Sequence, residues 1–185
     1  MGSMIEVRWH GRGGQGAVTS VELLAVSAIA AGKYAQGFPS FGPERRGAPV
    51  AAFTRIDDKK INVRSGIYEP DVVLVLDSSL IGLVPVTDGL KPDGKLIVNT
   101  PKTPEEIRRE LNFQGTVATV DGTGIARKEM GVPIANTTMI GALLKVIGVM
   151  ELDAMKDAID RRFGRIAQKN LNAMKRAYDE IKILN

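Results

Sequence analysis

The alternation of hydrophobic and polar residues divides the chain into short apolar runs separated by longer segments of helical periodicity. Ile5–Trp9 is rich in β-forming residues, and Asp71–Asp77 encloses a continuous apolar run, as in strands buried on both faces of a parallel sheet. Lys95–Asn99 and Thr116–Val120 are two further runs of strand length. These four segments are predicted to form strands of one largely parallel sheet.

The segments between these runs carry helix start and stop signals. Ala17–Ala31 contains one charged residue, Glu22, and is followed by Gly32 at the position that commonly ends a helix. Thr103–Leu111 opens with a threonine cap and has a glutamate three residues later, the pattern of a capping box. Because Ala17–Ala31 is apolar nearly all round, we expect it to be covered both by its own sheet and by another subunit.

The C-terminal part of the chain is predicted to be helical. Asn136–Gly148 begins with Asn136, a residue type that caps helices, and is almost uncharged. Two amphipathic helices are expected to follow, and their apolar positions at helical spacing are Leu152, Met155, Ile159 and Phe163, then Ala167, Leu171, Met174, Tyr178 and Ile181. These helices should pack on one face of the sheet.

Two more strand-like segments lie between the first helix and the first buried run. Tyr34–Phe38 is a short strand by its pattern, and Val50–Ile56 is predicted to pair with Lys60–Gly66 as a hairpin. The alternation of β and α units predicts one α/β domain over residues 1–185. Its expected architecture is a three-layer, largely parallel Rossmann-like sheet with C-terminal helices and one β-hairpin.

Composition narrows the class of protein. Of 185 residues 44% are hydrophobic and 25% charged, and no apolar stretch has the length of a membrane span, so we expect no membrane partner. The net charge of +4 is not clustered and aromatic residues make up only 5%, so we expect no nucleic-acid partner. The absence of cysteine fits a cytoplasmic protein and excludes an iron–sulfur or cysteine–zinc scaffold on this chain. With one histidine we expect no metal site, and residues 1–3 are interpreted as a cloning remnant without a role.

A glycine-rich loop follows the first predicted strand and precedes the first helix. Its residues are Gly11, Arg12, Gly13, Gly14, Gln15 and Gly16, which match the G-x-G-x-x-G pattern of nucleotide-binding loops. We expect Gly11 and Gly13 to permit positive φ, and the N–H groups of Gly14–Ala17 to face an anion. The alternative is a tight turn buried under a partner. A nicotinamide cofactor is disfavoured because the second predicted strand ends in YAQGFPS, with no acidic residue from there until Glu44.

A second unusual stretch is FPSFGPERRGAPV, residues 38–50. Three prolines and two glycines make it irregular and stiff, so Glu44, Arg45 and Arg46 are expected on a preformed loop. An arginine held in place suits phosphate or carboxylate, because its planar fork donates two hydrogen bonds at once. The alternative is an ion pair between Glu44 and one of the arginines, within the loop or across an interface.

Three other positions near predicted strand or helix ends have both structural and chemical interpretations. His10 next to the glycines is more often structural than catalytic, although a proton-shuttling role stays open. Asp77, with the two serines that follow, ends the central strand where open α/β sheets place ligands, and we expect it to cap the next segment. Asn136 and Thr137 form either an N-cap or a further set of donors at a helix start.

Three motifs in order, HGRGGQG, FPSFGPERRGAPV and NTTMIGALLK, closely resemble the γ subunit of 2-oxoacid:ferredoxin oxidoreductases, particularly the pyruvate type. The resemblance extends over essentially the whole chain, and the G-P-E-R-R-G loop is far more specific than the glycine motif. It implies a complex that decarboxylates a 2-oxoacid on thiamine diphosphate, passes electrons through iron–sulfur clusters to ferredoxin and transfers the acyl group to coenzyme A.

The resemblance also implies where the cofactors and partners lie. Thiamine diphosphate, Mg and the clusters belong to other subunits, and α, β and δ subunits are the expected partners, in a dimer of heteromers. This chain would border the coenzyme A path without catalytic residues of its own. The candidate coenzyme A residues are Gly11, Arg12, Gly13, Gly14, Gln15, Gly16, Glu44, Arg45, Arg46, Asn136 and Thr137. A free-standing nucleotide-binding dehydrogenase and a ligand-free assembly module are the alternatives.

Overall fold

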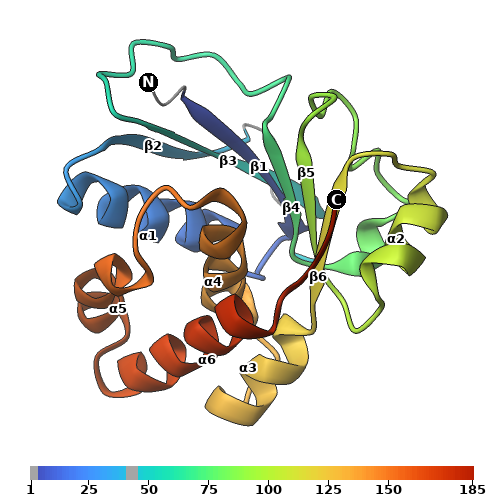
Figure 1. Ribbon diagram of the computed structural model, residues 1–185. Coiled ribbons are helices and arrows are strands. Elements are labelled where there is room, and N and C mark those ends of the chain that lie inside the picture. Colours follow the sequence, from blue (N-terminus) through green and yellow to red (C-terminus); the bar gives the residue numbers. More distant parts are fainter. Residues whose placement is uncertain (1–3, 41–45) are drawn as a thin grey trace.

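The computed structural model describes residues 4–40 and 46–185, which form a mixed seven-stranded sheet flanked by helices (Figure 1). The strand order is β2-β3-β1-β4-β5-β6-β7. The bounds are β1 Ile5–Arg12, β2 Tyr34–Pro39, β3 Pro49–Asp57, β4 Val72–Val75, β5 Lys95–Asn99, β6 Thr116–Val120 and β7 Lys182–Leu184. Strands β1, β4, β5 and β6 run parallel, while β2, β3 and β7 pair antiparallel with their neighbours.

Helices lie on both faces of the sheet. Their bounds are α1 Ala17–Ala30, α2 Pro104–Leu111, α3 Gly122–Met130, α4 Asn136–Ile147, α5 Lys156–Phe163 and α6 Ala167–Glu180, with short 3-10 turns at Ser78–Leu80, Leu152–Met155 and Gly164–Ile166. In Figure 1, α1 and α3–α6 gather on one face and α2 lies on the other. The structure therefore confirms the expected three-layer α/β architecture with a parallel centre and C-terminal helices.

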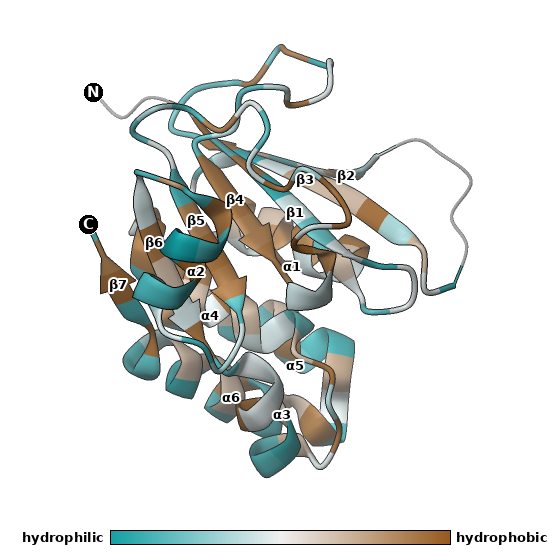
Figure 2. Ribbon diagram, turned by 90° about the vertical axis from the view of Figure 1, so that its right-hand side faces the viewer, coloured by the Kyte–Doolittle hydropathy of each residue, from teal (hydrophilic) through white to brown (hydrophobic). Residues whose placement is uncertain are grey.

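Two separate hydrophobic clusters, one on each face, form the core. Val72 and Leu74 of β4 point into the larger cluster with α1 and α4, whereas Val73 and Val75 point into the smaller one beneath α2. All four side chains are buried, as the continuous apolar run predicted. Figure 2 shows β4 and β5 as apolar strands, while the outer surfaces of α3 and α6 are largely polar.

Helix ends follow their sequence signals in two places. Thr103 accepts the N–H of Glu106, and the Glu106 carboxylate accepts the N–H of Thr103 at 2.7 Å, so the capping box is present. After α1, Gly32 has φ +84°, and the N–H groups of Gly32 and Lys33 reach back to the carbonyls of Ile29 and Ala28. This is a glycine-terminated helix end of the expected kind.

The predicted hairpin is wrong. Lys60–Gly66 has no strand in the structure, because β3 already has β2 on one edge and β1 on the other. No edge of β3 is left for a third partner, and the segment instead crosses to β4 as an irregular connection. It is anchored where the Arg55 guanidinium donates to the carbonyl of Gly66 at 3.2 Å and to Glu6 at 2.7 Å.

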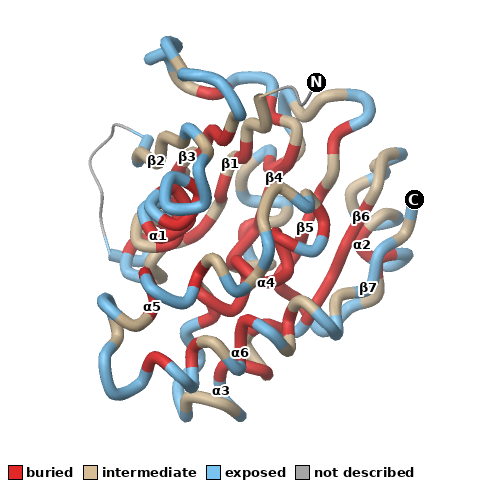
Figure 3. Tube along the Cα trace, turned by 60° about the vertical axis from the view of Figure 1, so that its left-hand side comes forward, coloured by how far each residue is buried: buried red, intermediate tan, exposed pale blue. Residues whose placement is uncertain are grey.

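Helix α1 is covered on the sheet side and open on the other. Its inward positions are buried, whereas positions on its other side are exposed (Figure 3). Among these, Val26 is 49% and Ile29 is 55% exposed. Thus one side of this apolar helix faces solvent in the single chain. Among the described residues, no helix combines the length and the apolar character needed to cross a membrane.

Candidate functional site

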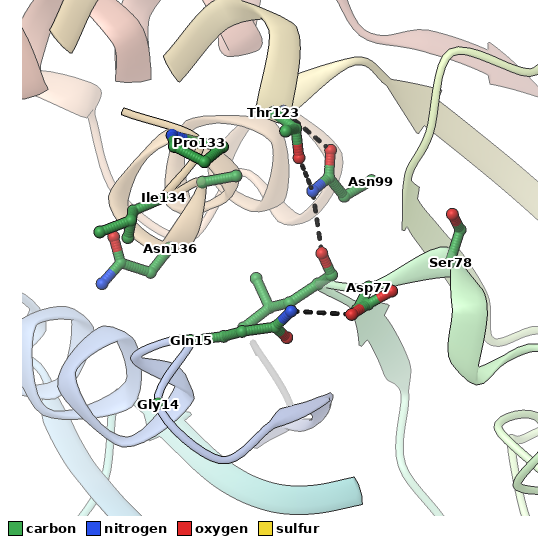
Figure 4. A pocket seen from close by; sticks show the side chains of 11 residues that line it. Gly14, Gln15, Asp77, Ser78, Asn99, Thr123, Pro133, Ile134 and Asn136 are labelled. Carbon is green, nitrogen blue, oxygen red and sulfur yellow. Dashed lines mark hydrogen bonds between the residues drawn. The ribbon is translucent and has the colours of Figure 1, made fainter. Parts of the chain in front are cut away.

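A pocket of about 320 Å³ lies at the carboxyl ends of β1, β4 and β5 (Figure 4). The chain leaves β1 toward α1 on one face of the sheet and leaves β4 toward the opposite face. The pocket therefore occupies a topological switch point, where open α/β sheets bind ligands. Its lining residues are Gly14, Gln15, Leu76, Asp77, Ser78, Asn99, Thr123, Pro133, Ile134, Ala135 and Asn136.

Asp77 is the hub of the polar contacts on this edge. Its carboxylate accepts from Gln15 Nε2 at 2.7 Å, from Arg12 Nε at 3.2 Å and from both the N–H and the hydroxyl of Ser79. Asp77 thus caps the Ser78–Leu80 turn, as predicted, and also fixes the glycine loop. Partial burial opposes its charge, but the bonds from Ser79 and Gln15 and the charge of Arg12 outweigh burial and lower the pKa of Asp77.

Arg12 joins three segments of the chain. Besides Asp77, its guanidinium donates to the Ser79 hydroxyl at 2.8 Å and to the carbonyl of Gly47 at 3.1 Å. Gln15 is also engaged at both ends, since its Oε1 accepts the N–H of Arg12 at 2.7 Å. These two candidate binding side chains therefore shape the loop through internal bonds.

The glycines of the loop that adopt positive φ are not the ones expected from the sequence. Gly14 has φ +92° and Gly16 has φ +82°, whereas Gly11 and Gly13 are not in that region. The reason is that β1 continues through Arg12, with Gly11 paired to Val50 of β3. The turn therefore begins later than the motif suggested, and the N–H of Gln15 is used internally by the carbonyl of Arg12.

Gly16 and Asn136 are packed against each other at the entrance of the site. A Cβ at Gly16 would lie 2.3 Å from Asn136 Nδ2, so the amide occupies the space that a side chain would need. Asn136 is not the N-cap of α4, contrary to expectation, because helical geometry starts at Asn136 and Ala135 is the cap residue. Its Oδ1 instead accepts the N–H of Thr137 at 2.8 Å.

Thr137 is separated from the pocket. Its side chain is fully buried, and its hydroxyl donates to Asn170 Oδ1 of α6 at 2.7 Å. Asn170 in turn donates to the carbonyl of Ile166. Thr137 therefore links α4 to α6, and it is not among the residues that line the pocket.

The two sequence motifs meet beside the pocket. The N–H of Gly13 donates to the carbonyl of Ala48 at 2.9 Å, and the N–H of Gly47 donates to the carbonyl of Gly13 at 3.0 Å. This pairing brings the Arg46 side chain to 4.0 Å from the Cβ position of Gly14. Glu44 and Arg45 lie outside the described residues. The described end of the proline-rich loop thus lies directly against the glycine loop.

Asn99 and Thr123 are site residues that the sequence analysis missed. Asn99 Nδ2 donates to the carbonyl of Leu76 at 2.8 Å and to the Thr123 hydroxyl at 2.9 Å, and its Oδ1 accepts the N–H of Thr123. Asn99 ends a predicted parallel strand, so the rule that drew attention to Asp77 could have found it. Thr123 offered no such signal, because α3 was not predicted.

His10 lies within β1 and does not line the pocket. Its Nε2 accepts a hydrogen bond from Arg8 Nε at 3.0 Å. Burial, followed by the nearby charge of Arg8, lowers the pKa of His10 to about 4. The imidazole is therefore neutral at pH 7, and these contacts favour the structural interpretation.

A switch-point pocket bounded by a glycine-rich strand–helix turn defines a Rossmann-like α/β protein. The model of the pyruvate ferredoxin/flavodoxin oxidoreductase family matches residues 6–180, and the chain belongs to this family. It is 52% identical over 179 residues to the pyruvate/ketoisovalerate oxidoreductases common subunit gamma of Thermococcus kodakarensis, covering 96% of this chain and 97% of that one. It is 50% identical over 179 residues to the pyruvate synthase subunit PorC of Methanocaldococcus jannaschii, with the same coverage.

Solved structures agree with this assignment. The crystal structure of the pyruvate oxidoreductase subunit PORC from Thermotoga maritima matches with a TM-score of 0.89 and 40% identity, over 100% of both chains. A 2-oxoglutarate:ferredoxin oxidoreductase from Magnetococcus marinus, with 2-oxoglutarate, coenzyme A and succinyl-CoA bound, matches at 0.74 and 20% identity, over 97% of this chain and 30% of that one, which shows a shared fold. The resemblance to γ subunits of the pyruvate and 2-oxoacid:ferredoxin oxidoreductases is confirmed.

Proposed function

We propose that this chain borders the coenzyme A path in an assembled 2-oxoacid:ferredoxin oxidoreductase that forms acyl-CoA and passes electrons to ferredoxin. The chain acts there as a single γ-type domain in the cytoplasm. Its partners are α, β and δ subunits in a dimer of heteromers, and these carry the thiamine diphosphate, the Mg and the clusters. The observation that supports this best is that the described end of the proline-rich loop lies against the glycine loop beside the switch-point pocket.

Charge divides the site into two parts. Among the residues that the structure describes, no lysine or arginine lines the pocket, and the Asp77 carboxylate lies in it, so its interior suits neutral amide or hydroxyl groups. A phosphate fits better at the Gly14 edge of the pocket, where the Arg46 side chain lies. Glu44 and Arg45 stay candidates from the sequence for the same region.

The arrangement of strands argues against a free-standing dinucleotide dehydrogenase. Such folds place a second parallel strand beside the first and use an acid at its end to hold the ribose. Here β1 lies between β3, which is antiparallel, and β4, while β2 is the edge strand beyond β3. On the side of β1 where such folds place that second strand, the neighbour is antiparallel β3, which offers no carboxyl end for a ribose-binding acid.

The test is steady-state kinetics of the reconstituted complex carrying Arg46→Ala, with coenzyme A and oxoacid varied separately. Loss of one shielded Arg–phosphate contact costs about 1.5–3 kcal/mol, so the KM for coenzyme A should rise roughly tenfold to a hundredfold while that for the oxoacid is unchanged. Arg109→Ala, on the exposed surface of α2, is the matched control. If the Arg46→Ala complex assembles normally and its KM for coenzyme A is unchanged, the phosphate-binding role is wrong and the chain acts as an assembly module.

A further inference from the structure

A second cavity, of about 400 Å³, opens beside the first. It lies between the start of α1, the connection from α3 to α4, and the junction of α5 with α6. Gly14, Gln15, Ile134 and Asn136 line both cavities and form the wall between them. The other lining residues are Gly16, Thr19, Met130, Val132, Arg162, Phe163, Ile166, Lys169 and Asn170. We call this cavity the basic cleft.

The charges of the basic cleft are the reverse of those in the switch-point pocket. Arg162 and Lys169 line the cleft, and no aspartate or glutamate in the described part of the chain does. The N-terminal end of α1 also opens onto it, with no acidic residue in the first turn and no side-chain cap. The Asn136 amide lies against Gly16 at the same end. The basic cleft thus combines two cationic side chains, the N-terminal end of a helix and a side-chain amide. The switch-point pocket, in contrast, contains the Asp77 carboxylate.

Arg162 and Lys169 stand apart from the neighbouring cations of α5 and α6. Lys156 pairs with Asp160, Lys175 pairs with Asp179 at 2.7 Å, and Arg176 pairs with Glu129 at 2.9 Å. Within residues 4–40 and 46–185, neither Arg162 nor Lys169 forms an ion pair or a side-chain hydrogen bond. Lys156, Lys175 and Arg176 are thus neutralised by neighbouring carboxylates, whereas Arg162 and Lys169 are available to a ligand.

The remaining wall of the cleft is apolar and unusually exposed. Val132, Ile134 and Ile166 are between 43% and 50% exposed, and Met130 and Phe163 lie beside them. Large apolar side chains gathered around one cavity mark a binding site rather than scattered surface residues. An apolar wall facing two cations suits a molecule with a flat apolar body and an attached phosphate.

We infer that the basic cleft binds a phosphorylated nucleoside, with its base against the Ile134 and Ile166 wall and its phosphate between the start of α1 and the Arg162 and Lys169 side chains. The inference rests on the proposed function in one respect: in the complex, the ligand is the 3′-phosphoadenosine end of coenzyme A. The rest of the molecule crosses the shared wall at Gly14 and Gln15 toward the switch-point pocket. The nucleotide end thereby gains its own site, distinct from the Arg46 contact.

The experiment is calorimetric titration of the full chain with adenosine 3′,5′-bisphosphate, and separately with inorganic phosphate. The bisphosphate should bind, and Arg162→Ala or Lys169→Ala should each weaken it about tenfold. Lys175→Ala is the matched control on α6, because this lysine is paired with Asp179 and does not line the cleft, and it should leave binding unchanged. Ile166→Ser should weaken the bisphosphate while leaving inorganic phosphate unaffected.

Four results would overturn the inference. Three come from the titrations: the absence of bisphosphate binding by the wild-type chain, equal loss of affinity in Lys175→Ala, and binding of inorganic phosphate as tight as that of the bisphosphate. Weaker subunit association in Lys169→Ala with unchanged nucleotide affinity would assign the cleft to a partner segment and also refute it. The link to the proposed function is tested separately: bisphosphate binding that depends on Lys169, with a coenzyme A KM unaffected by Lys169→Ala, supports the nucleotide site and removes coenzyme A as its ligand, whereas the proposed function itself fails on the Arg46→Ala kinetics.

Discussion

The side-chain amide of Gln15 donates to the Asp77 carboxylate at 2.7 Å, joining residues 62 positions apart in the chain. The bond fixes the glycine loop that follows β1 to the end of β4. Arg12 reaches the same carboxylate from the loop's other end. The Asp77 carboxylate therefore holds the glycine loop in place beside the candidate site, and its replacement should lower the stability of the fold.

Asp77→Asn should destabilise the fold by about 1–3 kcal/mol, because the amide can accept fewer of the bonds from Gln15, Arg12 and Ser79 and loses the charge that Arg12 faces. Urea unfolding monitored by circular dichroism measures this. Asp58→Asn is the control, since that carboxylate pairs with Lys33 on the exposed surface, and its unfolding midpoint should stay unchanged. Equal midpoints for Asp77→Asn and wild type would contradict the bracing role.

Gly16→Ala should lower the free energy of unfolding more than Gly131→Ala does, because Gly131 has a similar positive φ but free space around its Cβ position. At Gly16 the new methyl group adds a collision with Asn136 to a φ of +82°. At Gly131, φ is +78° and no atom lies within 4 Å, so Gly131→Ala measures the strain alone, about 1 kcal/mol. Adding Asn136→Ala to Gly16→Ala should recover part of the difference; no recovery would mean that the two residues are not in contact.

The pKa of His10, lowered to about 4 from an ordinary value of 6.5, makes stability depend on pH. Between these values the unfolded chain binds a proton that the folded chain does not, so the free energy of unfolding should fall as pH drops from 6.5 toward 4, by about 3 kcal/mol at most. Since the chain has one histidine, a single imidazole signal in NMR titration reports it. His10→Gln should flatten this part of the profile, and a titration midpoint near 6.5 would refute the lowered pKa.

Val26→Asp and Ile29→Asp should leave the isolated chain folded, because both side chains are about half exposed on the open side of α1. In the complex, a carboxylate buried at a subunit contact is costly, so association should weaken at least about tenfold. Analytical ultracentrifugation of each variant mixed with the other subunits measures this association. Val63→Asp, at a similarly exposed position outside α1, is the control, and equal behaviour of all three variants would mean that another face makes the contact.

Elements whose signal is local were predictable from sequence. The bounds of β5 and the capping box of α2 matched, because a buried apolar run and a cap are encoded within a few residues. In contrast, β7 is three residues long and exists through pairing with β6 and the bond from Arg108 to the carbonyl of Leu184. Helix α3 contains two glycines and few apolar residues, so its periodicity is weak, and it is stabilised by packing against α6.

The candidate site was predictable in location but not in detail. The glycine loop, Asp77 and Asn136 all reach the switch-point pocket, as expected from strand ends and helix starts. The roles of individual glycines were misjudged because β3 pairing extends β1 through Arg12, a long-range effect. Thr137 turned inward because α6 supplies Asn170, which the motif around Thr137 does not encode.

The position of β1 between an antiparallel and a parallel neighbour has a consequence for folding. Its pairing with β3 brings Ala48 to the glycine loop, and its pairing with β4 brings Asp77 to the same loop. Each pairing closes a long stretch of chain, and loop closure must be completed before the contacts it permits can form. A chain without the β1–β4 pairing lacks the Leu76–Ser78 wall of the pocket, and one without the β1–β3 pairing lacks the Arg46 side chain beside Gly14, so the complete candidate site exists only once both pairings have formed.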